Sequence, residues 1–161
     1  GQEEDGLPVY LFEQVGANFM GFESQIQYFL LDTLSEEWSL DLQPDYVLAR
    51  DSTTDQYLPR IPPFRLLLGT TYSHQSLGRA RLEVQQVFEQ NKVAEYETTT
   101  PGYTMLNLYL SREIPIGTQT WEVFIRGTNL LGEKARNAVS FTKDVAPLPG
   151  ASAMMGVRYR F

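Results

Sequence analysis

The sequence predicts an all-β fold, an antiparallel transmembrane β-barrel segment of about eight strands. Three observations lead to this prediction. The last stretch, residues 151–161, alternates apolar and polar side chains, as a strand with two different faces does. The expected connections between strands are alternately short and long. Large aromatic residues recur at strand ends, beside the short connections.

Eight extended stretches follow one another along the 161 residues, which we expect to form a single barrel segment. They are Val9–Glu13, Phe19–Leu31, Trp38–Arg50, Phe64–Tyr72, Gly78–Gln90, Tyr103–Ser111, Gln119–Asn129 and Ala151–Phe161. Trp38–Arg50 has the clearest alternation, although Pro44 interrupts it, since proline cannot donate a hydrogen bond to the ladder. The final stretch carries Arg158 and Arg160 on its polar face.

Alternation alone does not say which face is buried, because a soluble barrel turns its apolar side chains inward and a membrane barrel turns them outward. Loop length favours the membrane barrel. The short connections are Asp32–Glu37, Ser73–Leu77 and Glu113–Thr118, and the long ones are Asp51–Pro63, Asn91–Gly102 and Leu130–Gly150. Gln14–Ala17 is an exception, being short where a long loop is expected. Tight turns at one rim and long loops at the other are typical of outer-membrane barrels.

Aromatic residues on the apolar face predict a girdle at the membrane interface. They lie next to the short turns and are Tyr28, Trp38, Tyr72, Trp121, Tyr159 and Phe161. Large aromatics also close the end of a soluble barrel, so the pattern by itself leaves that alternative open. Charged residues of the opposite face would line the inner wall as pairs; they are Arg79, Arg81, Glu83, Arg126, Arg158 and Arg160.

Composition and motifs exclude several function classes. The net charge of -7 argues against a nucleic-acid partner, which calls for a basic patch. Cysteine is absent, so there is neither a disulfide nor a thiolate metal site. No apolar run approaches the roughly 18 to 20 residues of a transmembrane helix. His74 is the single histidine and no glycine-rich phosphate loop is found, so we expect no enzyme and no cofactor.

Candidate metal ligands are few and scattered. His74 lies alone in a short turn, which makes a poor metal site. Four loop carboxylates, those of Asp51, Asp55, Glu95 and Glu97, could attract a cation, but solvated side chains are the simpler interpretation. The sequence therefore predicts no metal site.

Several stretches of the sequence resemble segments of known proteins. They are Gly127–Asn137, which begins Gly-Thr-Asn-Leu-Leu-Gly, Ser140–Gly150, Leu58–Leu66, Gly21–Glu23 and the final strand up to Phe161. Together they resemble TonB-dependent outer-membrane receptors, and the resemblance extends from about Leu7 to Phe161. The run Lys143–Gly150 is most similar to the branch of these receptors linked to zinc uptake.

The resemblance implies the C-terminal part of a receptor in the bacterial outer membrane that actively imports a metal or metal complex, such as a siderophore or zinc. Such receptors have a plug domain and a TonB box; neither is recognised in residues 1–161, so contact with TonB would occur only through the missing plug region. The expected partners are outer-membrane lipid and the barrel-assembly machinery, for which the terminal Phe161 is the implied signal.

An alternative from another class remains open. A small eight-stranded barrel, soluble or embedded in a membrane, could act as a structural module or bind an apolar ligand in its interior. The two hypotheses differ in one physical respect, which is whether the apolar face of the sheet lines an interior or points outward. Whether the folded protein depends on detergent therefore discriminates between them.

Overall fold

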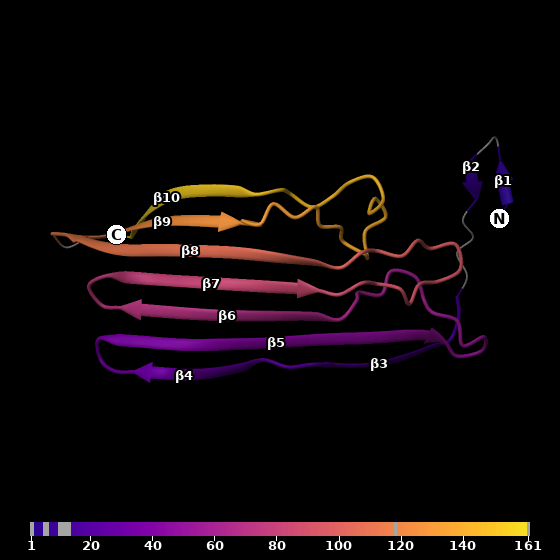
Figure 1. The fold of residues 1–161 in the computed structure, drawn as a ribbon, viewed down its shortest axis with the longest axis horizontal. Coiled ribbons are helices and arrows are strands. Elements are labelled where there is room, and N and C mark those ends of the chain that lie inside the picture. The colour runs from indigo at the N-terminus through magenta and orange to yellow at the C-terminus, as the bar shows by residue number, and fades with distance from the viewer. Residues whose placement is uncertain (1, 5–6, 10–13, 118, 161) are drawn as a thin grey trace.

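The computed structural model describes residues 2–4, 7–9, 14–117 and 119–160, and the architecture is one long β-sheet (Figure 1). Two short strands, β1 (Gln2–Glu4) and β2 (Leu7–Val9), pair with each other apart from it. The large sheet contains β3 (Ala17–Glu23), β4 (Ile26–Asp32), β5 (Glu36–Asp51), β6 (Arg65–His74), β7 (Gly78–Val87), β8 (Tyr103–Ile116), β9 (Gln119–Thr128) and β10 (Ser152–Arg160). Within the described residues, no helix is long and apolar enough to cross a membrane.

The eight strands of the large sheet form an antiparallel meander, which confirms the predicted fold class. Their order is β10-β9-β8-β7-β6-β5, and β3 and β4 both pair with the far edge of β5. The predicted stretch Val9–Glu13 differs. Val9 belongs to β2 and pairs with Gln2 outside the large sheet, and residues 10–13 lie outside the described part of the chain.

The predicted strand Phe19–Leu31 is divided into β3 and β4 at residues 24 and 25. The division lies opposite Pro44 of β5. The backbone N–H of Ser24 donates to the carbonyl of Pro44 at 3.1 Å, but Pro44 has no N–H to donate in return. The ladder is therefore incomplete at this point, and the edge strand breaks where its partner lacks a donor.

The two faces of the sheet have opposite chemistry and unequal burial. Ser39, Asp41 and Thr71 share one face and are at most 7% exposed, whereas Leu68 and Met155 on the other face are 47% and 77% exposed. Among the elements that the structure describes, each strand of the sheet contacts only its ladder neighbours. In a single layer, such unequal exposure arises when the sheet curves toward the less exposed face. The polar face is therefore concave and the apolar face convex.

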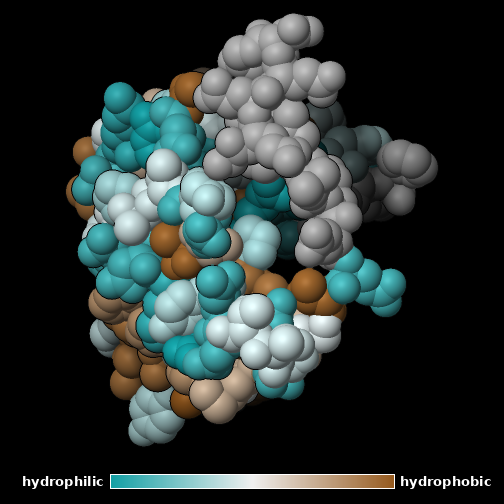
Figure 2. All heavy atoms as spheres, turned by 90° about the vertical axis from the view of Figure 1, so that its right-hand side faces the viewer, coloured by the Kyte–Doolittle hydropathy of each residue, from teal (hydrophilic) through white to brown (hydrophobic). Residues whose placement is uncertain are grey.

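The end-on view agrees with this arrangement. Figure 2 shows hydrophobic residues gathered along the lower left margin of the molecule, with hydrophilic residues toward the middle. The two ends also differ (Figure 1): tight turns join β4 to β5 and β6 to β7 at one end, and three long connections, residues 52–64, 88–102 and 129–151, lie at the other. The structure thus reproduces the predicted alternation of short and long connections.

Candidate functional site

A network of charged side chains lies on the concave face. We call it the polar wall, and it consists of Asp41, Thr71, Arg81, Glu83, Asn107, Tyr109, Glu122 and Arg158. Arg81 is at its centre. Its Nη1 donates to Asp41 Oδ2 at 2.5 Å and to Thr71 Oγ1 at 2.9 Å, and its Nη2 lies 3.2 Å from Glu83 Oε2. These contacts join β5, β6 and β7 across the sheet.

Gly69 makes room for this arrangement. A Cβ at Gly69 would lie 2.7 Å from Arg81 Nη2 and would displace the guanidinium, which extends over the glycine toward Asp41. Asp41 is only 7% exposed, and a buried carboxylate requires a partner because an unpaired buried charge is costly. The sequence prediction that inner-wall charges form pairs is correct for Arg81 and Glu83.

A second ion pair continues the polar wall to the C-terminal strands. Arg158 Nη1 donates to Glu122 Oε2 at 2.7 Å, and the Tyr109 hydroxyl donates to Glu122 Oε1 at 3.1 Å. Glu122 is 8% exposed, so both carboxylate oxygens are satisfied within a buried setting. The wall thus extends from β5 to β10 as a hydrogen-bonded polar surface, the kind that lines the interior of an outer-membrane barrel.

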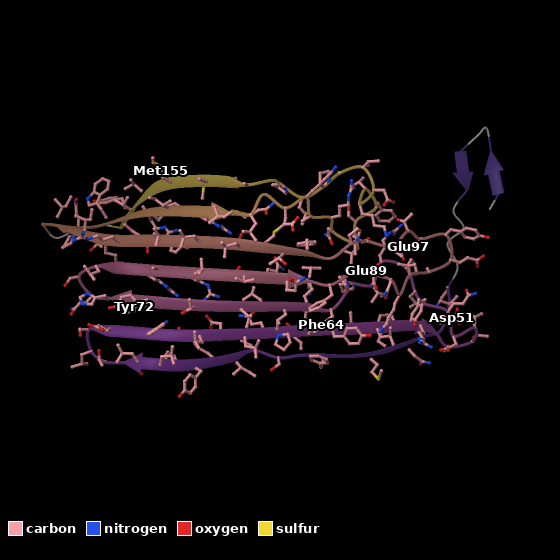
Figure 3. All side chains as sticks on the ribbon, in the orientation of Figure 1. Asp51, Phe64, Tyr72, Glu89, Glu97 and Met155 are labelled. Atoms are coloured by element: carbon pink, nitrogen blue, oxygen red, sulfur yellow. The ribbon has the colours of Figure 1, made fainter. Side chains whose placement is uncertain are left out.

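The three long loops are joined into one unit at Glu97, which Figure 3 labels at the loop end of the sheet. The Glu97 carboxylate accepts hydrogen bonds from the backbone N–H groups of Arg60 and Ala94, each at 3.3 Å, and from Lys143 Nζ at 3.5 Å. Lys143 also donates to the Thr98 carbonyl. Since Arg60, Glu97 and Lys143 come from different loops, we call these residues the loop cluster.

Asn129 begins the longest loop and explains the Asn-Leu-Leu motif in structural terms. Its side chain is fully buried and its backbone is left-handed, with φ of 51°. The Nδ2 group donates to the carbonyls of Glu133 and Pro149 at 2.9 and 3.1 Å, and Oδ1 accepts from the Glu133 N–H at 3.0 Å. The Asn129 N–H donates to Asn107 Oδ1 at 3.0 Å. One residue therefore fixes both ends of the loop and ties it to the polar wall.

The predicted aromatic residues lie where the sequence placed them, on the convex face near the short turns. We call them the aromatic rim: Tyr28, Trp38, Tyr72, Trp121 and Tyr159. Trp38 is directly opposite Tyr72, and Trp121 is opposite Tyr159 with ring centroids 4.8 Å apart. Figure 3 shows Tyr72 near the short-turn end of β6. The sixth predicted residue, Phe161, lies outside the described residues.

The candidate metal ligands do not come together. His74 Nδ1 accepts hydrogen bonds from the N–H groups of Ser76 and Leu77 and so shapes its own turn. Asp55 forms an ion pair with Arg50 at 2.7 Å. Glu95 raises the pKa of the neighbouring Tyr96 phenol, first by a hydrogen bond and then by charge repulsion. In the described ranges, no three or more His, Asp or Glu side chains are grouped so that they could hold a metal ion.

Sequence reasoning missed the two features that organise the loops, Glu97 and Asn129. The sequence predicts Glu97 to be a solvated loop carboxylate or one that attracts a cation. Its partner Lys143 is 46 positions away in the sequence, so no local pattern indicates the pair. Asn129 was recognised as part of a motif without a physical role. Its position directly after a strand was the available signal, because asparagine tolerates the left-handed backbone.

These features define a class of protein. A curved antiparallel meander with a polar concave wall, an apolar convex face, tight turns at one end and long loops at the other is the architecture of an outer-membrane β-barrel. The apolar side chains do not line an interior, so the structure does not support the alternative of a barrel that holds an apolar ligand inside.

Comparison with known proteins identifies the family. The profile described as TonB dependent receptor-like, beta-barrel matches residues 2–130, and the chain therefore belongs to that family, whose place is the bacterial outer membrane. Among solved structures, the protein is similar to one described as copper transporter OprC, with a TM-score of 0.75 and 21% sequence identity. The match covers 91% of this chain and 24% of OprC, so the chain spans about a quarter of the length of that protein.

Proposed function

We propose that this chain is the C-terminal barrel segment of a TonB-dependent receptor that imports a metal ion or metal complex across the outer membrane. Membership of the TonB-dependent receptor family is the observation that carries the proposal. The polar wall would face the plug domain in the complete receptor, and TonB would act through that domain. The loop cluster at the long-loop end would form part of the external surface, since long loops of such barrels are extracellular.

We propose first a class of cargo, a metal, and then particular candidates within that class. A metal is favoured because the similar solved structure is described as a copper transporter. Zinc is favoured within this class by the run Lys143–Gly150, which resembles the zinc-linked branch, and a siderophore complex is the other candidate. Lys143 and the backbone around it are held by Glu97 and Arg136, so in this proposal the run supports the loop surface and does not ligate the metal.

Metal accumulation in cells tests the cargo. A strain lacking the receptor that contains this chain is compared with the same strain carrying it, with and without TonB. Cellular copper, zinc and iron are measured by mass spectrometry after growth in metal-depleted medium with copper, zinc or a ferric siderophore supplied. We expect one of the three to accumulate only when both the receptor and TonB are present. Equal accumulation of all three in both strains would contradict the proposal.

We further propose that the aromatic rim lies at the periplasmic membrane interface and that Phe161 is read by the barrel-assembly machinery. The position of the rim next to the short turns supports the first part. The second part rests on the family resemblance. Deletion of Phe161 should reduce the amount of receptor recovered from the outer membrane, measured by immunoblot, whereas replacing Phe141 in the long loop by alanine should leave it unchanged.

A further inference from the structure

The aromatic rim has a gap on β7 and β8. In the register of the sheet, Tyr72 lies opposite Ala80, and Ala80 lies opposite Leu110. Leu110 in turn is opposite Ile125, four positions from Trp121 on β9. The aromatic residues therefore do not follow a row perpendicular to the strands, and two strands between Tyr72 and Trp121 contribute no aromatic residue to the rim.

Strand tilt explains the oblique course of the rim. Strands of such barrels tilt by about 35 to 45°. With strands about 4.8 Å apart and a rise of about 3.3 Å per residue, a line level with the membrane advances by about one residue per strand. Starting at Tyr72 on β6, it reaches β9 close to Trp121. On β8, between them, the same line passes Arg112, so an arginine occupies the level of the missing aromatic.

Arg112 lies on the convex face. Its ladder partner is Val123, and it shares its side of β8 with Leu110 and Ile114. It is exposed, and within the described ranges no ion pair joins it to a carboxylate. On the concave face, Arg81 and Arg158 each have a carboxylate partner. A long cationic side chain on the lipid-facing surface near the end of a strand extends to the level of the headgroups, where the phosphates lie.

A groove of about 560 Å³ runs over the convex face beside Arg112. Its apolar lining comes from Tyr72, Leu77, Ala80, Leu110, Val123 and Ile125. The small side chain of Ala80, between Tyr72 and Leu110, leaves the hollow. Gly78 holds the adjoining turn close to the arginine, since a Cβ at Gly78 would lie 3.1 Å from the Cβ of Arg112.

We propose that this groove binds a glycerophospholipid of the periplasmic leaflet, with an acyl chain over Ala80 and Leu110 and the phosphate at Arg112. Charge complementarity selects this occupant, because arginine pairs with phosphate through parallel charge-assisted hydrogen bonds. Position supports it too, since the short turns of an outer-membrane barrel face the periplasm. The lipid replaces the aromatic side chains missing from the rim. This site concerns the lipid contact of the receptor and is independent of the cargo proposed above.

Native mass spectrometry of the receptor that contains this chain tests the site. The protein is extracted from outer membranes in mild detergent, stripped of lipid, and titrated with palmitoyl-oleoyl phosphatidylglycerol. Loss of the charge-assisted hydrogen bonds in Arg112→Gln should weaken binding about tenfold. Ala80→Leu, which fills the groove, should weaken it comparably. Arg126→Gln makes the same chemical change on the concave face of the neighbouring strand and should bind as the unaltered protein does.

Two further measurements make the result decisive. A diacylglycerol with the same chains has no phosphate and should bind much more weakly than phosphatidylglycerol to the unaltered protein. A gel-mobility shift on boiling shows whether each variant is folded. If Arg112→Gln is not folded, Arg112→Lys replaces it. Lysine keeps the charge but cannot form two parallel hydrogen bonds to the phosphate, so Arg112→Lys should bind more weakly than the unaltered protein, and Ala80→Leu should show the full expected loss. Unchanged phosphatidylglycerol binding in folded Arg112→Gln or Ala80→Leu, or equal binding of the diacylglycerol, would overturn the proposal.

Discussion

Leu40 and Asp41 are adjacent in β5, yet the apolar leucine is 40% exposed and the charged aspartate is only 7% exposed. The same reversal separates Val123 from Glu122 on β9, at 40% and 8%. In a water-soluble sheet the exposed face would be the polar one. The difference between the two faces shows that the solvent of the convex face is lipid and that the concave face must satisfy its charges internally.

Leu82→Arg should cause the largest loss in the free energy of unfolding, compared with the same change on the concave face. Leu82 is at the middle of β7 on the convex face and is 42% exposed. A charge placed near the bilayer midplane costs about 2 to 4 kcal/mol. The measurement is the free energy of unfolding by urea in phospholipid vesicles, followed by tryptophan fluorescence. Gln85→Arg, on the concave face of the same strand, should cost far less, and equal costs would contradict the assignment of the faces.

Asn129→Ala tests how firmly the concave face holds the longest loop. It removes buried hydrogen bonds to Glu133 and Pro149 and should destabilise the protein by about 2 kcal/mol. Asn129→Gly loses the same bonds but accepts the left-handed backbone without strain, so it should cost less than alanine. Hydrogen exchange at the Glu133 amide is the readout. If that exchange stays slow in both variants, Asn129 does not anchor the loop.

Asp41→Asn tests the ion pairs of the polar wall. The change removes the charge opposite Arg81 while keeping the shape, and Arg81 retains Glu83. We therefore expect a loss of about 1 to 2 kcal/mol in the free energy of unfolding, below that of a completely orphaned charge. The matched control is Asp55→Asn, which breaks an exposed ion pair with Arg50 and should change stability by less than about 1 kcal/mol.

Trp121→Leu probes the edge of the convex face and has the smallest expected effect. Loss of the ring contact with Tyr159 should cost about 1 kcal/mol. The position of the rim is checked separately, by quenching tryptophan fluorescence with lipids brominated at different depths. Bromines close to the headgroup should quench Trp38 and Trp121 most. If bromines at the bilayer centre quench most strongly, the aromatic rim does not lie at the membrane interface.

Much of the fold could be predicted because it is local. Period-two alternation located the strands from Trp38 onward, and turn lengths assigned the two ends. The features that the sequence did not predict depend on contacts between residues far apart in the chain, which local patterns do not reveal. The break after Glu23 arises from a missing donor at Pro44, about 20 positions away, and depends on the register between two strands. The loop cluster brings Glu97 to Lys143 across 46 positions, which composition cannot indicate.

By itself, the sequence determined that the sheet has two unlike faces, one apolar and one charged, with tight turns at one end and long loops at the other. Loop lengths favoured a polar inner face, but only the tertiary structure decided that this face curves inward and which charges meet there. Alternation shows that the two sides of a strand differ, but it does not say which side lies on the concave face of the sheet. The curvature of the whole sheet determines which face is concave, and the register that successive hairpins impose brings Asp41 to Arg81.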